Sequence, residues 1–135
     1  MKLILAGVAA FLISLIAGFV FHGMVLHGDY AQLPNLMRPD SDAMNYLPFM
    51  MLSHFIKGMA FAWVYKQGMS GAGWLGQGIR FGFVMCLLIT VPLYLVYYSV
   101  QPMPAMLVVK QIIFDSIGTM LMGIVVALIM KPKAS

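Results

Sequence analysis

The chain has 135 residues, of which 62% are hydrophobic and only 9% are charged. Soluble globular domains are about 45–50% apolar and about 25% charged, so this composition excludes that class and predicts a protein dissolved in a lipid bilayer. Because a membrane-spanning helix needs about 20 apolar residues, the length allows four or five spans at most. We expect them to form a single transmembrane domain over residues 1–135.

Four apolar segments follow one another along the chain. They predict helical spans over residues of about 3–25, 46–65, 74–98 and 104–130. Residues 26–45 carry two prolines and three aspartates, which indicates an outer loop. Within it we expect a short interfacial helix over 30–37, interrupted by Pro34. The predicted fold class is therefore all-α, an integral membrane four-helix bundle.

The positions of the basic residues predict how the bundle is oriented. Lysines flank the first, second and fourth spans, whereas the loop over 26–45 has one arginine against three aspartates. By the positive-inside rule, both termini and the connection at 66–73 are cytoplasmic. Tyrosines at the other span ends, Tyr30 and Tyr94 among them, mark the outer interface. The eight basic residues are spread over the chain and form no nucleic-acid-binding patch.

Small residues at four-residue spacing mark one face of each predicted span. Such faces let helix backbones approach closely, which supplies the packing that drives association inside a membrane. We therefore expect the four faces to meet in the centre of the bundle. The glycines predicted at these contacts are Gly18, Gly58, Gly78, Gly82 and Gly123.

The polar residues inside the spans fall on these same faces. They predict a buried polar cluster of His22, His54, Lys57, Gln111 and Asp115. Lys57 and Asp115 both lie roughly 16 Å below the outer boundary if the helices run straight across. Since an ionised group at mid-membrane costs roughly 3 kcal/mol, we expect these two residues to form an ion pair. The pair is either a structural bridge between helices or part of a proton relay.

Other chemistry has weaker support in the sequence. His22 and His54 could serve as the two axial ligands of a haem, but their expected depths differ by roughly 7 Å. The histidines and aspartates match no compact metal-ligand spacing, and the serines lack a nucleophile motif. The single cysteine, Cys86, has no adjacent base. The sequence therefore predicts no enzyme, no cofactor and no metal site.

Several short motifs carry a resemblance to a group of membrane proteins. They are His22-Gly23, the segments 65–68 and 76–82, Pro92 with Tyr94 and Tyr97, and Lys110-Gln111 ahead of Asp115. In these features the chain resembles small four-span proteins of the bacterial inner membrane, from families of unknown function. The resemblance implies a four-helix membrane fold in that membrane and carries over no catalytic role.

Three functions follow as hypotheses. The first is a non-enzymatic accessory or scaffolding subunit of a larger membrane complex, since short loops leave the membrane-facing surfaces as the main binding area. Its partners would be the bilayer and other membrane subunits, or a second copy of the chain. The alternative is a small proton-coupled transporter or channel-like module that uses the buried His/Lys/Asp cluster. The third is a haem- or quinone-associated redox subunit that uses His22 and His54.

Overall fold

The computed structural model describes residues 1–70 and 73–132, and every regular element among them is a helix. Four helices are long and apolar enough to cross a membrane, as the sequence predicts. They cover Lys2–Val25, Asp40–Gln67, Trp74–Val100 and Ala105–Met130. The second begins at Asp40 rather than near residue 46, because a helical turn at Asp40–Ala43 and a 3₁₀ turn at Met44–Tyr46 run directly into it.

Two of the four long helices contain a π-helical turn. The first consists of α1 (Lys2–Gly18) followed by a π-helical segment at Phe19–Val25. The third consists of α5 (Trp74–Met85), a π-helical segment at Cys86–Thr90, and α6 (Val91–Val100). The second and fourth are α3 (Asp40–Ala43) continued by α4 (Leu47–Gln67), and α7 (Ala105–Met130).

The predicted interfacial helix over 30–37 is wrong in its position. The short helix in this segment is α2, His27–Ala31, and only turns follow it. Pro34 explains the early end, since it has no N–H to donate and disfavours a helical conformation at Leu33. The helix also begins earlier than predicted, at His27, and Tyr30 lies inside it.

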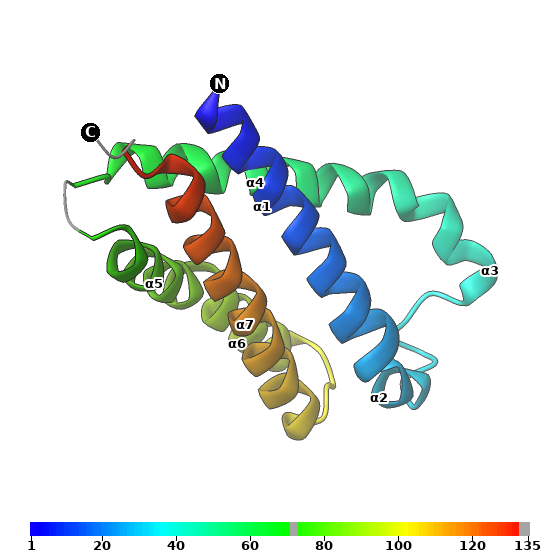
Figure 1. Cartoon of the computed structure of the whole chain (residues 1–135). Helices are drawn as coiled ribbons and strands as arrows, with labels where there is room; N and C mark the ends of the chain where they lie inside the picture. The colour runs from blue at the N-terminus through cyan, green and yellow to red at the C-terminus, as the bar shows by residue number, and fades with distance from the viewer. Residues whose placement is uncertain (71–72, 133–135) are drawn as a thin grey trace.

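The four long helices are not all parallel. α1 packs against both α4 and α7, and α7 also packs against α5. Figure 1 shows α4 crossing α1 obliquely, with the two chain termini at the same end of the molecule. The Nζ atom of Lys2 donates to the carbonyl oxygen of Lys131 at 2.6 Å, which ties these two ends together.

Glycines lie where helix backbones touch. A Cβ atom on Gly58 would come within 2.4 Å of the backbone nitrogen of Phe11, and one on Gly123 within 2.6 Å of the carbonyl oxygen of Gly78. At Gly82 the same atom would meet the Cα of Met120 at 3.0 Å. Only glycine fits such contacts without moving a helix, which places the α1–α4 and α5–α7 contacts on glycines.

The buried apolar residues form two separate clusters. The larger joins α1, α4, α5 and α7 and contains Ala6, Ala10, Phe61, Ala62, Tyr65, Met85, Met122, Val126, Ala127 and Met130. The smaller lies beside α2 and contains Leu26, Tyr94, Met103, Leu107 and Val108. Large apolar side chains such as Ile16, Phe49, Leu88 and Met106 are exposed on the outside. The bundle thus keeps many small residues inside and presents large apolar ones outward.

Candidate functional site

Asp115 on α7 is the centre of a hydrogen-bonded polar network. Its Oδ1 atom lies 2.9 Å from Nε2 of His22, in the π-helical turn after α1. Its other oxygen accepts a hydrogen bond from the hydroxyl of Tyr94 on α6. The side chains of His22 and Asp115 keep 28% and 25% of their surface exposed, so the pair is not sealed inside the bundle.

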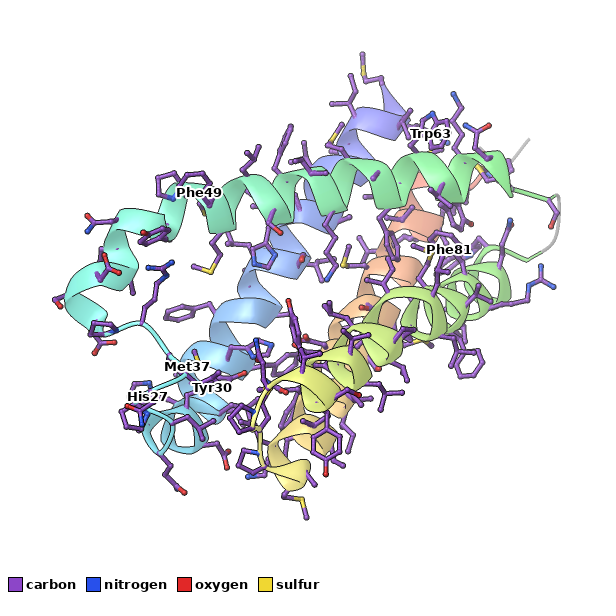
Figure 2. All side chains as sticks on the ribbon, turned by 180° about the vertical axis from the view of Figure 1, so that it is seen from behind. His27, Tyr30, Met37, Phe49, Trp63 and Phe81 are labelled. Atoms are coloured by element: carbon purple, nitrogen blue, oxygen red, sulfur yellow. The ribbon has the colours of Figure 1, made fainter. Side chains whose placement is uncertain are left out.

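Tyr30 on α2 extends the network beyond the first long helix. Its hydroxyl lies 2.5 Å from Nδ1 of His22, and Nε2 of Gln111 donates to the same hydroxyl at 2.9 Å. Both ring nitrogens of His22 are therefore engaged. Figure 2 shows Tyr30 at the end of the molecule opposite Trp63 and Phe81.

One assignment of hydrogens satisfies these contacts. Gln111 donates to Tyr30, the hydroxyl of Tyr30 donates to Nδ1 of His22, and Nε2–H of His22 donates to Asp115. Tyr94 donates to the same carboxylate. His22 is then neutral and Asp115 ionised. Burial raises the pKa of the Tyr30 hydroxyl above its ordinary value, and the nearby carboxylates add to this, so Tyr30 remains a donor.

Gln111 takes part in the network through only one end of its amide group. Its amide nitrogen is used, but its Oε1 atom is buried and has no hydrogen-bond partner within the described residues. A buried acceptor without a donor costs about 1–3 kcal/mol. A rotation of the amide would give this oxygen the hydroxyl hydrogen of Tyr30, so the network has a second arrangement of hydrogens available.

One of the two π-helical turns contributes a residue to this network, and the other comes just before Tyr94 in the chain. His22 belongs to the one at Phe19–Val25. The other contributes Thr90, whose hydroxyl lies 3.4 Å from that of Thr119, and Cys86, whose thiol donates to the carbonyl oxygen of Ser116 at 3.5 Å. π-helical turns are rare and are frequently found at functional sites. Pro92 follows the second turn, where its missing N–H breaks the regular helical pattern.

An ion pair holds α2 in place over the network. Nζ of Lys110 lies 2.9 Å and 3.0 Å from the two carboxylate oxygens of Asp29. Lys110 precedes Gln111 on α7, and Asp29 precedes Tyr30 on α2. The pair therefore fixes the position of Tyr30 relative to α7.

The expected ion pair between Lys57 and Asp115 is wrong. Asp115 bonds to His22 and Tyr94, and Lys57 is half-buried without an ion-pair or hydrogen-bond partner in the part of the chain that the structure describes. His54, one turn before Lys57, instead bonds through Nδ1 to Oγ of Ser14 at 2.7 Å. The depth estimate failed because α4 crosses the bundle obliquely and is anchored on α1 rather than on α7.

The residues proposed for the polar cluster thus separate into two groups. His22, Gln111 and Asp115 belong to one connected network, whereas His54 and Lys57 lie on α4 outside its chain of hydrogen bonds. Sequence reasoning missed Tyr30 and Tyr94, which carry the ordinary signature of interface aromatics. Their spacing gives no sign that the hydroxyls point at His22 and Asp115.

A haem or a metal ion could bind His22 only if one of the two hydrogen bonds of its ring were broken. No group of three histidine, cysteine or acidic side chains is placed to hold a metal ion among residues 1–70 and 73–132. The arrangement favours proton chemistry over ligation.

Comparison of the chain with protein-family models, curated proteins and solved structures found no match. The contacts of the site are therefore the basis for its function. A carboxylate, an imidazole and two phenols meet at one place in a bundle of apolar helices. These groups can pass a proton along hydrogen bonds that already exist.

Proposed function

We propose that this is a non-enzymatic multi-pass protein of the bacterial inner membrane, with both termini in the cytoplasm, that acts as a small proton-coupled transport module. The observation that carries the proposal is the imidazole of His22, bonded at one nitrogen to Tyr30 and at the other to Asp115. Ionisable groups inside a membrane span are costly, and they typically mark ion or proton pathways. The exposure of large apolar side chains on the outside of the bundle supports the membrane location.

Proton binding at this site needs only small movements. A proton that reaches the oxygen of Tyr30 from water releases the hydroxyl hydrogen to Nδ1 of His22. The imidazolium formed in this step is stabilised by the carboxylate of Asp115, 2.9 Å from Nε2. Rotation of the Gln111 amide then turns its unpaired Oε1 toward Tyr30, where it accepts the hydrogen that Tyr30 retains. Histidine suits this role because one ring nitrogen can accept a proton while the other donates one.

Among the described residues, the other half of the bundle has no such chain of hydrogen-bonded polar groups. Beyond Thr119 on α7, the contacts with α5 are made by Gly78, Gly82 and Gly123, whose backbones touch. A proton bound at His22 therefore reaches the other side only when this contact opens. We expect slow, gated transport rather than the rate of an open channel.

Proton flux into liposomes tests the proposal. Liposomes that contain the reconstituted protein are loaded with a pH-sensitive dye, and a potassium diffusion potential is imposed across their membrane. We expect flux above that of protein-free liposomes, and at least about tenfold less in His22→Gln or Asp115→Asn. His54→Gln is the matched control, because this histidine is bonded to Ser14 and lies outside the network.

Two results would overturn the proposal. One is wild-type flux no greater than that of protein-free liposomes. The other is flux that persists in both network variants. A single sharp peak in size-exclusion chromatography and an unchanged helical circular dichroism spectrum identify the variants that fold.

The accessory-subunit function is the second candidate, and α4 favours it. All the buried residues of α4 lie from Gly58 onward, and residues 47–53 at its start are exposed. Lys57, at this boundary, is half-buried without a counter-charge among the described residues. A helix from a partner subunit with a carboxylate at this depth would satisfy both features.

Purification in mild detergent separates the two functions. If α4 binds a partner, a stoichiometric membrane protein co-purifies with the wild type and is lost with Lys57→Met. Lys66→Met, at the exposed end of α4, should retain it. Recovery of the chain alone, or equal recovery of a partner with both variants, contradicts the accessory function.

A further inference from the structure

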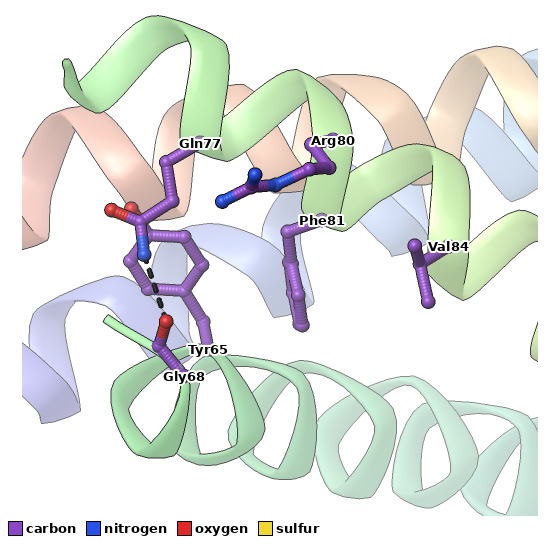
Figure 3. A pocket seen from close by; sticks show the side chains of 6 residues that line it. All are labelled: Tyr65, Gly68, Gln77, Arg80, Phe81 and Val84. Carbon is purple, nitrogen blue, oxygen red and sulfur yellow. Dashed lines mark hydrogen bonds between the residues drawn. The ribbon is translucent and has the colours of Figure 1, made fainter. Parts of the chain in front are cut away.

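A second site lies at the end of the bundle opposite the polar network. A pocket of about 190 Å³ opens between the end of α4 and the start of α5. Figure 3 shows its lining, with the guanidinium of Arg80 extended over the pocket. The lining residues are Tyr65, Gly68, Gln77, Arg80, Phe81 and Val84. Drug-sized sites begin at about 300 Å³, so this pocket takes part of a larger molecule.

The lining changes from polar to apolar along α5. At the outer rim, Gln77 is only 7% exposed and its amide nitrogen donates to the carbonyl oxygen of Gly68 at 3.0 Å. Arg80 comes next, and Phe81 and Val84 follow deeper along the same helix face. This order matches a phospholipid, in which a charged headgroup is followed by acyl chains.

Within residues 1–70 and 73–132, the charged side chains at this end are basic. Arg80 is exposed and makes no ion pair in residues 1–70 or 73–132, and none of the four acidic side chains of the protein lines the pocket. Lys2 and Lys131 are joined at the same end, where Lys131 also lies 5.4 Å from the ring of Trp74. An uncompensated arginine among lysines attracts an anion, and its planar fork suits a phosphate.

We propose that this pocket binds the headgroup of an anionic phospholipid. The phosphate contacts the guanidinium of Arg80, and the first part of one acyl chain lies against Phe81 and Val84. Arg80 lies about 9 Å along the helix from Trp74, within reach of the headgroup layer. The site is separate from the proton network and does not depend on it.

Native mass spectrometry of the detergent-solubilised protein tests the proposal. The wild type should bind phosphatidylglycerol more tightly than phosphatidylcholine. Arg80→Gln should weaken phosphatidylglycerol binding roughly fivefold, as expected for the loss of one interfacial arginine. Lys66→Gln is the matched control, because it removes an exposed charge near the pocket that does not line it. It should change the affinity less than twofold.

A second variant keeps the charge and fills the space. Val84 is 51% exposed, so Val84→Trp should fold and occupy the apolar end of the pocket, reducing binding as much as Arg80→Gln. Three results would overturn the proposal: equal binding of both lipids, equal losses in Arg80→Gln and Lys66→Gln, or complete displacement of the lipid by millimolar inorganic phosphate. The last would indicate a simple anion site. Proton flux through the His22 network is a separate readout, so failure of one proposal leaves the other standing.

Discussion

The two halves of the bundle are held together by different interactions. In the half that contains the chain termini, α1 meets α4 and α5 meets α7 at glycines, with a large apolar cluster between them. In the half that contains α2, the helices are joined by hydrogen bonds among His22, Tyr30, Tyr94 and Asp115. Glycine backbones in direct contact have one packed arrangement, whereas groups in a hydrogen-bond network can exchange the roles of donor and acceptor. The difference supports the proposal that one half provides the scaffold and the other the proton site.

The largest expected effect breaks the scaffold half. Gly58→Ala places a methyl group 2.4 Å from the backbone nitrogen of Phe11, so α4 must move away from α1. We expect a loss of about 3 kcal/mol or more in the free energy of unfolding. Unfolding in mixed micelles, followed by circular dichroism, measures it. Gly76→Ala is the matched control, since a Cβ there meets no atom within 4 Å and should stabilise the helix by up to about 1 kcal/mol.

The next effect breaks the polar half. Asp115→Ala removes the acceptor of both His22 and Tyr94 and should cost about 2–3 kcal/mol in the same measurement. Asp115→Asn keeps an acceptor at the same place and should cost about half as much. Equal stability of Asp115→Ala and the wild type would show that the network contributes nothing to folding.

Ser14→Ala tests the one polar contact between α1 and α4. The hydroxyl of Ser14 is bonded to Nδ1 of His54 at 2.7 Å, and its loss should cost about 1 kcal/mol of unfolding free energy. Proton flux should not change, because the contact lies outside the network. A loss of flux in Ser14→Ala would place His54 in the pathway.

The smallest effect is expected for Thr90 and Thr119, which lie at the boundary between the two halves. Thr90 and Thr119 are buried and their hydroxyls lie 3.4 Å apart, a long hydrogen bond. Either single change to valine should cost about 1 kcal/mol because it leaves one hydroxyl unpaired, whereas the double change should be nearly neutral. Strongly additive losses in a double-mutant cycle would contradict this pairing.

Much of the scaffold half could be predicted from the sequence. The spacing of Gly58, Gly78, Gly82 and Gly123 identifies faces that must meet, because a stripe without side chains can only be filled by another backbone. The structure places each of them at such a contact. Gly18 is different: a Cβ there would meet the ring of His54 at 3.2 Å rather than a backbone.

The polar half could be predicted only in part. His22, Gln111 and Asp115 lie on the expected inner faces, but the choice of partners depends on helix tilt and on the π-helical turns. Depth along straight helices favoured Lys57 for Asp115, whereas the oblique α4 leaves His22 as the partner. No local sequence pattern predicts that α2 folds back over the bundle. This fold brings Tyr30 to His22.

The sequence alone thus determined that the chain forms four long apolar helices and which small residues let them approach. This is so because hydrophobic length and helical periodicity are local properties. Only the tertiary structure decided how α4 crosses the bundle, where α2 folds back, and which groups surround Asp115. Those outcomes depend on contacts between residues up to 93 positions apart, such as His22 and Asp115, and no local pattern encodes the angle at which two helices cross.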